Sequence, residues 1–370
     1  MISTTRSNGI VMAAVMAAVS ILMAGCGSAT DTRPAGSEPI HLPVSSRPPA
    51  TSTARPSSPP SATPRPAGTL DNPIDLASLA LETRTIRPSA VIETKVGPYS
   101  VIQTGGRLWV GSPDGLVRID PEAKTAAFVD HDHGAKVVAR GVNVWRAAYL
   151  DDRVTRYDGR TGKMLGRVTL PAPLGMSVSG PLWVSLHNSG EIVQVNESTG
   201  AEIRRVMVAT EGASGAGEVM PIGSDVWVVS TDDRSVVQVD ARSGRLGRRI
   251  EFPGPVCEQA AFTATAIWVC LAVGEDEPPL VQRLDVASGA LGPVYRFESS
   301  PGSAISVGAT TWLPTARGML GVDAATGVPA RFLAIDAGNV VPRYAIRAFG
   351  SIWVVCRDGQ VLEFTPSDFA

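Results

Sequence analysis

Three side chains that could bind a polar ligand recur at one position relative to the tryptophans of the chain. Tyr99, Glu258 and Arg343 each stand ten residues before a tryptophan, and Glu218 stands nine residues before another. A phenol, two carboxylates and a guanidinium brought to one place could hold a polar ligand through hydrogen bonds and charge. Ordinary solvated loop residues would show the same pattern. The spacing therefore makes these residues ligand-binding candidates, and we assign no catalytic role to any of them.

A second group of polar residues is the loop Asp130-His131-Asp132-His133, with His187 further along the chain. Alternating imidazoles and carboxylates could chelate a metal ion, but two ligand types in one loop do not fix a coordination geometry. Exposed turn residues explain the loop equally well, and no Cys-x-x-Cys or Cys/His spacing indicates zinc. We expect no bound metal and no cofactor, and we retain His133 as a ligand-binding candidate.

The elements that must position these residues follow from the tryptophans. All seven lie in short apolar runs, such as LWVGS and IWVVC, that are bounded by Gly, Asp or Pro, and successive ones are 36 to 44 residues apart. Runs this short predict strands. A period of about 40 residues in a strand-rich chain is typical of a β-propeller with one blade per repeat. We predict an all-β, seven-bladed propeller with antiparallel, four-stranded blades and the tryptophans in the core.

Turn residues support the same repeat. A second strand follows each tryptophan strand, and in the second to sixth repeats it ends at an Asp or Asn that precedes a Gly by four residues: Asp158, Asn196, Asp240, Asp285 and Asp323. An Asp or Asn that opens a turn and a Gly that closes it are typical of a hairpin. The last repeat has room for only three strands. Because an open ring would expose two sheet edges, we expect residues 89–96 to add the fourth strand to the last blade.

The N-terminal region differs in composition from the rest. Residues 1–25 place Arg6 before an apolar run, which predicts a secretory signal peptide. The string Leu-Met-Ala-Gly-Cys that ends at Cys26 resembles the bacterial lipobox, whose cysteine carries lipid. The alternative is a secreted protein with an unmodified cysteine. We predict lipidation of Cys26 and attachment to the outer side of the cell membrane.

Three further segments complete the predicted organisation. Residues 26–69 are rich in Pro, Ser and Thr and predict an extended linker. Residues 70–87 form a lead-in with a predicted short helix at 76–82 that packs against the outside of the ring. Residues 88–370 form the propeller.

The three other cysteines are Cys257, Cys270 and Cys356. Cys257 and Cys270 face each other across one predicted hairpin, about two residues away from direct opposition, and an oxidising compartment permits a disulfide between them. Cys356 falls in another blade and is expected to be a buried free thiol. The alternative is three buried thiols.

The repeat of an apolar-Trp-Val strand followed by Val-x-x-x-Asp-x-x-Thr-Gly resembles the YVTN/NHL-like propellers, including the streptogramin B lyase-like group common in actinobacteria. The resemblance covers nearly all of residues 88–370 and implies the fold. The lyase activity would imply magnesium-dependent ring opening of a cyclic depsipeptide through histidine and glutamate on the later blades. Because this chain has no histidine after His187, the activity is not carried over.

These observations favour a non-enzymatic surface lipoprotein whose propeller binds a protein, glycan or small ligand on its loop face. The alternative is a lyase or hydrolase that uses Glu258, Glu218 or His133 as acid or base. The net charge is −2, with charges of both signs interspersed, and no basic stripe indicates nucleic-acid binding. We expect a monomer.

Overall fold

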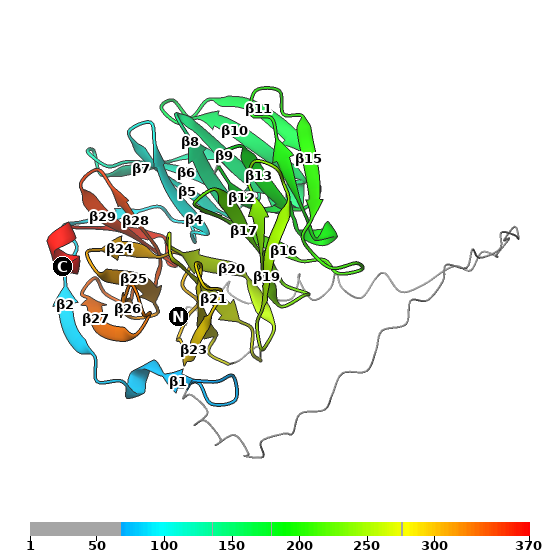
Figure 1. The fold of residues 1–370 in the computed structure, drawn as a ribbon. Helices are drawn as coiled ribbons and strands as arrows, with labels where there is room; N and C mark the ends of the chain where they lie inside the picture. Colours follow the sequence, from blue (N-terminus) through cyan, green and yellow to red (C-terminus); the bar gives the residue numbers. More distant parts are fainter. Residues whose placement is uncertain (1–67, 135, 179, 275–276) are drawn as a thin grey trace, which may run out of the picture. The chain divides into compact units, whose positions relative to one another are not determined.

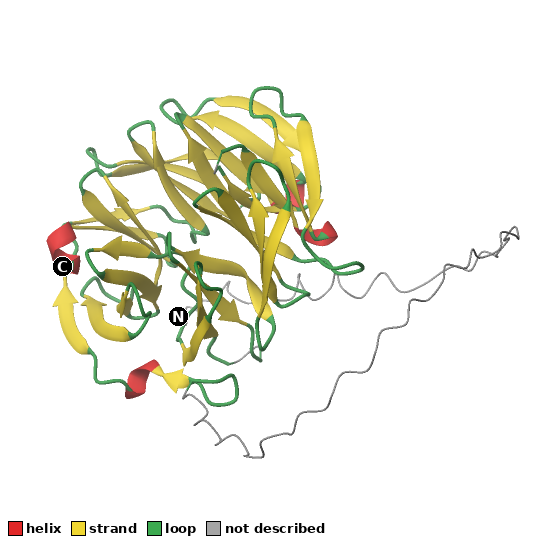
Figure 2. Cartoon of the chain, viewed as in Figure 1, coloured by secondary structure: helices red, strands yellow, loops and turns green. Residues whose placement is uncertain are grey.

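The computed structural model describes residues 68–134, 136–178, 180–274 and 277–370. These residues form seven sheets, each containing one tryptophan strand, and Figure 1 shows them arranged around a common centre. The first strand of each repeat lies innermost, because these strands contact one another from blade to blade. Strands make up nearly all of the regular structure, and the helices are short 3₁₀ turns (Figure 2). The prediction of an all-β, seven-bladed propeller is confirmed.

The blades are numbered in chain order, and their strands run from the inner edge outward. Blade one contains β4 (Ser100–Thr104), β5 (Arg107–Ser112), β6 (Gly115–Asp120) and β7 (Thr125–Asp130). Blade two contains β8 (Lys136–Arg140), β9 (Asn143–Ala148), β10 (Arg153–Asp158) and β11 (Met164–Thr169). Blade three contains β12 (Pro173–Ser177), β13 (Leu182–Leu186), β14 (Glu191–Val195) and β15 (Glu202–Met207). Blade four contains β16 (Ala216–Ile222), β17 (Asp225–Ser230), β18 (Ser235–Asp240) and β19 (Leu246–Glu251).

The last three blades also take strands from the N-terminal side of the chain. Blade five contains β20 (Val256–Phe262), β21 (Ala266–Leu271), β22 (Leu280–Asp285), β23 (Leu291–Arg296) and β1 (Ile74–Asp75). Blade six contains β24 (Ile305–Val307), β25 (Thr310–Thr315), β26 (Gly318–Asp323), β27 (Pro329–Ile335) and β2 (Glu82–Ile86). Blade seven contains β28 (Pro342–Ala348), β29 (Ser351–Cys356), β30 (Gln360–Phe364) and β3 (Ala90–Glu93). The 3₁₀ turns are η1 (Leu76–Ser78), η2 (Tyr149–Asp151), η3 (His187–Ser189) and η4 (Pro366–Phe369).

The core is divided among the junctions between blades. Each of the seven buried apolar clusters contains one tryptophan and lies between the blade of that tryptophan and the next blade. No tryptophan is more than 3% exposed. The indole of Trp183, in blade three, donates a hydrogen bond of 3.1 Å to the carbonyl of Ala241, which follows β18 of blade four. A single sheet cannot bury both of its apolar faces, so stacking the blades in a ring is what completes the core.

The predicted Asp/Asn-to-Gly turns form as expected between the third and fourth strands of blades two to six. Asp240 shows the arrangement: its carboxylate accepts hydrogen bonds from the backbone N–H and hydroxyl of Ser243, both of 2.6 Å. Gly244 then adopts a φ of +72°, a conformation that glycine reaches without strain. In blade one the equivalent position is Lys124, with a φ of +53°. These turns lie on one face of the ring, and the candidate site lies on the opposite face.

The ring is closed by the N-terminal strand β3, as predicted. It pairs antiparallel with β30 of the last blade, with Val91 opposite Leu362 and Ile92 opposite Val361. Ile92 is 3% exposed and packs in the cluster between blades seven and one, whereas Val91 is 48% exposed. Strand β3 therefore completes the last sheet and covers the edge of β30.

The lead-in segment differs from its prediction. The helix expected at 76–82 is only the 3₁₀ turn η1, and it is flanked by β1 and β2. Strand β1 pairs parallel with β23, and β2 pairs parallel with β27, so blades five and six have five strands instead of the predicted four. In Figure 1 this blue segment runs along the outside of the ring past both blades. The segment pairs with the outer edges of blades five and six, which would otherwise be exposed. This pairing is why the segment is extended and not helical.

Candidate functional site

The inner strands of four blades begin with an irregularity at the same end of the ring. The register between the first two strands shifts near the start of β12, β16, β20 and β28. A bulge of this kind places extra residues opposite one residue of the partner strand and redirects side chains. Adjacent residues can therefore both face the centre of the ring. Counting ten residues back from each tryptophan identifies this end of the inner strands. It does not identify which of two adjacent residues contacts the site.

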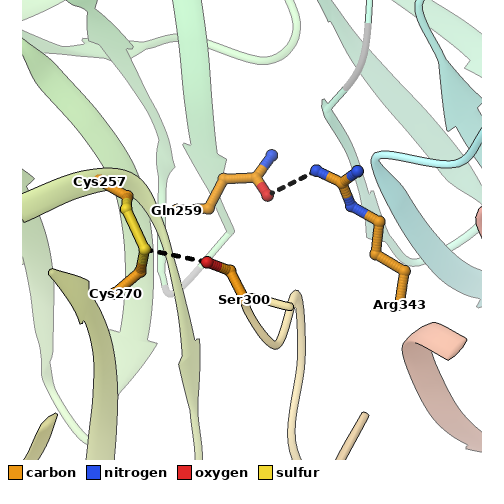
Figure 3. The surroundings of a disulfide bond; sticks show 5 residues. All are labelled: Cys257, Gln259, Cys270, Ser300 and Arg343. Atoms are coloured by element: carbon orange, nitrogen blue, oxygen red, sulfur yellow. Dashed lines mark hydrogen bonds between the residues drawn. A yellow bond between two sulfur atoms is a disulfide. The ribbon is translucent and has the colours of Figure 1, made fainter. Parts of the chain in front are cut away.

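Arg343 and Tyr99 are brought together, as the spacing suggested. The guanidinium of Arg343 lies 4.7 Å from the ring centroid of Tyr99 and 6.0 Å from that of Tyr344. Arg343 also donates to the side-chain oxygen of Gln259 over 3.4 Å, and Figure 3 shows these two side chains pointing toward each other from strands of blades five and seven. The Tyr344 hydroxyl donates to the same oxygen over 3.2 Å. Burial raises the pKa of Tyr344, and the negative charge of Glu218 raises it further against the opposing effect of Arg343.

Glu218 makes an ion pair that the sequence did not indicate. Its carboxylate accepts a hydrogen bond from the ammonium group of Lys136, at the start of β8. Glu218 is only 7% exposed, so its charge needs this partner to offset the loss of hydration. The pair joins blade two to blade four and reaches past the inner strand of blade three. The ion pair fixes the position of the Glu218 carboxylate within the site.

Glu258 faces His187. The imidazole Nε2 of His187 lies 3.5 Å from a carboxylate oxygen of Glu258, which links η3 of blade three to β20 of blade five. The ring of His187 also meets Tyr149 edge to face, with centroids 5.9 Å apart, and the Tyr149 hydroxyl donates to Asn188 over 3.1 Å. Burial raises the pKa of Tyr149, with a further contribution from the charge of Glu258. The contact therefore brings an imidazole and a carboxylate from two different blades together.

The three contacts have one feature in common: each joins blades that are not neighbours in the ring. They run from blade two to four, from three to five, and from five to seven. Glycines in or just before the inner strands of the intervening blades leave room for two of them. A Cβ added at Gly217 would lie 2.5 Å from the carbonyl oxygen of Glu258, and one at Gly302 would lie 2.4 Å from the Tyr344 ring. The site is therefore a cluster of polar side chains from several blades around the axis of the ring.

His133 does not belong to this cluster. Its side chain is exposed, and its backbone N–H donates to Asp151 over 3.0 Å. The two aspartates of the same loop are occupied by arginines: Asp130 pairs with Arg146, and Asp132 pairs with Arg153 over 2.6 Å. Among residues 68–134, 136–178, 180–274 and 277–370, no group of three or more His, Cys, Asp or Glu side chains is arranged to hold a metal ion.

The disulfide lies close to the site. Cys257 and Cys270 are joined, with Cα atoms 5.3 Å apart, and Ser300 donates a hydrogen bond to the Cys270 sulfur over 2.9 Å (Figure 3). Between Val256 and Ala260 the register of β20 against β21 shifts by two residues. This shift brings Cys257 level with Cys270 and removes the offset that the sequence implied. Cys356 is buried and free, and burial raises the pKa of its thiol.

Four residues of the cluster were not identified from the sequence: Lys136, Tyr149, Gln259 and Tyr344. Three of them are next to a residue that stands ten positions before a tryptophan, namely residues 135, 258 and 343. Residue 135 itself lies outside the described residues. The usable signal was the pairing of polar neighbours at 258–259 and 343–344, because a bulge can present both. Tyr149 gave no comparable signal.

The proposed lipidation site, Cys26, and the signal and linker regions up to residue 67 lie outside the described residues. In the part of the chain that the structure does describe, no helix is both long enough and apolar enough to span a bilayer.

No protein-family model matches the chain, and no curated protein matches its sequence. Solved structures do resemble its fold. Virginiamycin B lyase from Staphylococcus aureus aligns with a TM-score of 0.60 and 14% identity, over 75% of this chain and 98% of the lyase. A catalytically inactive variant of that lyase with quinupristin aligns with a TM-score of 0.58 and 16% identity, over 75% and 99%.

A chain of the mitotic checkpoint complex aligns with a TM-score of 0.62 and 12% identity, over 87% of this chain and 99% of that chain. A lyase and a chain of the mitotic checkpoint complex share this architecture, so at these identities the likeness concerns the fold and not the chemistry. The chain is a seven-bladed β-propeller that is structurally similar to virginiamycin B lyase.

Proposed function

We propose that the propeller is a binding platform whose ligand occupies the polar cluster around the ring axis. The observation that carries the proposal is the convergence of the Lys136–Glu218, His187–Glu258 and Arg343–Gln259 contacts at one end of the ring. Ordinary loop residues do not require partners on non-neighbouring blades. A rigid scaffold that gathers polar side chains from distant parts of the chain is typical of a ligand site.

We also propose that the platform is displayed on the outer side of the cell membrane. The support is the lipobox-like string that ends at Cys26, followed by the Pro-, Ser- and Thr-rich stretch. A lipidated Cys26 would anchor the chain, and the linker would hold the propeller away from the bilayer. Metabolic labelling with palmitate tests this part: label should enter the wild type and not a Cys26→Ser variant. Equal labelling of the two would contradict it.

The binding proposal is tested by capture from intact cells with the purified full-length chain. The variant is Glu258→Ala, and the matched control is Glu122→Ala, an exposed glutamate in the blade-one turn on the opposite face. We expect the captured molecule, whether protein, glycan or small ligand, to be lost with Glu258→Ala and retained with Glu122→Ala. Capture that tolerates both Glu258→Ala and Arg343→Gln would place the ligand elsewhere and contradict the proposal.

One observation favours a second candidate, a lyase or hydrolase. The imidazole of His187 and the carboxylate of Glu258, two side chains that commonly act as general acid or base, lie 3.5 Å apart, and the fold resembles that of virginiamycin B lyase. Here Glu258 would orient His187, and His187 would move the proton. Incubation of the full-length chain with quinupristin, followed by mass spectrometry, tests this candidate. Turnover that disappears with His187→Ala would favour the enzyme, and unchanged quinupristin would count against it.

A further inference from the structure

Arg343 is a half-buried cation with no anionic partner in the described part of the chain. None of the ion pairs there includes its guanidinium, and its hydrogen-bond partner is the neutral side chain of Gln259. Its guanidinium carbon lies over two aromatic rings, 4.7 Å from the Tyr99 centroid and 6.0 Å from the Tyr344 centroid. Stacking on a ring holds a guanidinium by its face and leaves the N–H groups at its edge available.

The amide orientation of Gln259 follows from its two neighbours. Its side-chain oxygen accepts from Arg343 over 3.4 Å and from the Tyr344 hydroxyl over 3.2 Å. The guanidinium can only donate, so the opposite orientation would set the amide NH₂ against a donor. The NH₂ group is therefore turned away from Arg343 and Tyr344, and within the described residues it donates no hydrogen bond. It remains a second donor in the cluster, with its orientation set by Arg343 and the buried Tyr344.

The nearby carboxylates do not neutralise Arg343. Glu218 is held by Lys136, and Glu258 faces His187. Glu218 still influences the site, since its negative charge raises the pKa of Tyr344. The presence of the two carboxylates disfavours a doubly charged ligand group and favours one that carries a single negative charge.

We propose that Arg343, Gln259 and Tyr99 form a carboxylate-binding site at the end of the ring axis. The edge of the guanidinium would receive the two carboxylate oxygens side by side, as arginine commonly does. The Gln259 amide and the Tyr99 hydroxyl would supply further donors. This inference rests on the proposed binding platform and specifies the chemistry of its ligand: a molecule that presents one carboxylate.

The test uses benzoate, which carries one carboxylate and a flat apolar ring, and measures its binding to the full-length chain by saturation-transfer NMR. We expect saturable binding that weakens about 10- to 100-fold with Arg343→Gln, the range for losing a hydrogen bond to a charged group. The matched control is Arg347→Gln, an exposed arginine at the other end of β28, which should bind as the wild type does.

A second variant, Gln259→Glu, guards against a folding defect. It keeps the shape of the side chain and supplies Arg343 with its own carboxylate, so the fold should persist while benzoate binding falls at least 10-fold. Absence of saturable benzoate binding to the wild type, or unchanged binding in both variants, would overturn the inference. Inorganic phosphate that displaces benzoate more strongly than acetate does would overturn the choice of a carboxylate. If cellular capture were lost with Glu258→Ala but survived Arg343→Gln, the platform would stand and this inference would fail.

Discussion

Closure of the ring by β3 makes a quantitative prediction about Ile92. Ile92→Ala removes three carbon atoms from a side chain that is 3% exposed and packed between blades seven and one. At about 0.8 kcal/mol per buried methylene, the lost transfer free energy is about 2.4 kcal/mol. The cavity that remains raises the expected loss in the free energy of unfolding to about 3–4 kcal/mol. That is a large share of the roughly 5–15 kcal/mol that holds a typical domain folded.

The matched control is Val91→Ala in the same strand, where the side chain is 48% exposed. This variant should change stability by no more than about 0.5 kcal/mol. The assay is equilibrium unfolding in urea, followed by the fluorescence of the buried tryptophans, of which Trp353 lies in the same cluster as Ile92. If Ile92→Ala lowered the free energy of unfolding no more than Val91→Ala does, β3 would not contribute to the core, and the account of ring closure would be refuted.

Three further predictions concern other parts of the ring. Replacing both Cys257 and Cys270 by alanine should lower the free energy of unfolding by about 3 kcal/mol, as expected for a disulfide that closes a short loop; an unchanged urea midpoint would contradict this. Hydrogen bonds from the serine side chain and backbone of its turn lower the pKa of Asp240. The resulting stabilisation is complete above the unfolded pKa of about 3.9 and is lost as the pH falls through the lower folded value, so Asp240→Asn should flatten the acid side of a melting-temperature profile. Gly302→Ala would place a Cβ 2.4 Å from the Tyr344 ring and should destabilise the chain by about 1–3 kcal/mol in a urea titration, where no change would show that the ring can move aside.

The blade number and the ring closure could be predicted because their signals are local and repeated. Each tryptophan strand and each Asp-to-Gly turn is an independent sign of one blade. A wrongly assigned strand in one repeat therefore does not alter the predicted number of blades. The role of residues 89–96 followed from a missing partner in the last blade. Both conclusions depend on patterns over about 40 residues, which tertiary contacts reinforce.

The candidate site was only partly predictable, because bulges decide which side chains face the axis. Counting back from the tryptophans marked Glu258 and Arg343, which make contacts in the cluster, but missed Gln259 and Tyr344 beside them. Whether an inner strand shifts register depends on its neighbours across the ring, which no short window of sequence contains. For the same reason, the offset expected between the two cysteines of blade five is absent from the structure.

The helix prediction at 76–82 failed for a related reason. Its leucines and alanines fit a helical period, but β1 and β2 pair with strands more than 200 residues later in the chain. Strand β2 buries only Ile86, so its own sequence carries little apolar alternation. The preference for an extended conformation comes from the exposed edges of blades five and six, and a partner so distant leaves no trace in the local pattern.

The outer strands β1 and β2 determine how a mechanical load would enter the molecule. Tension applied to the chain ahead of residue 68 would reach β1 first, then β2, and only afterward β3. Strand β1 pairs with its partner over two residues and β2 over five, and both run parallel to their partners, so a pull along them would shear these pairings. The last blade would thus be shielded from strain by two attachments that can slip without opening the ring.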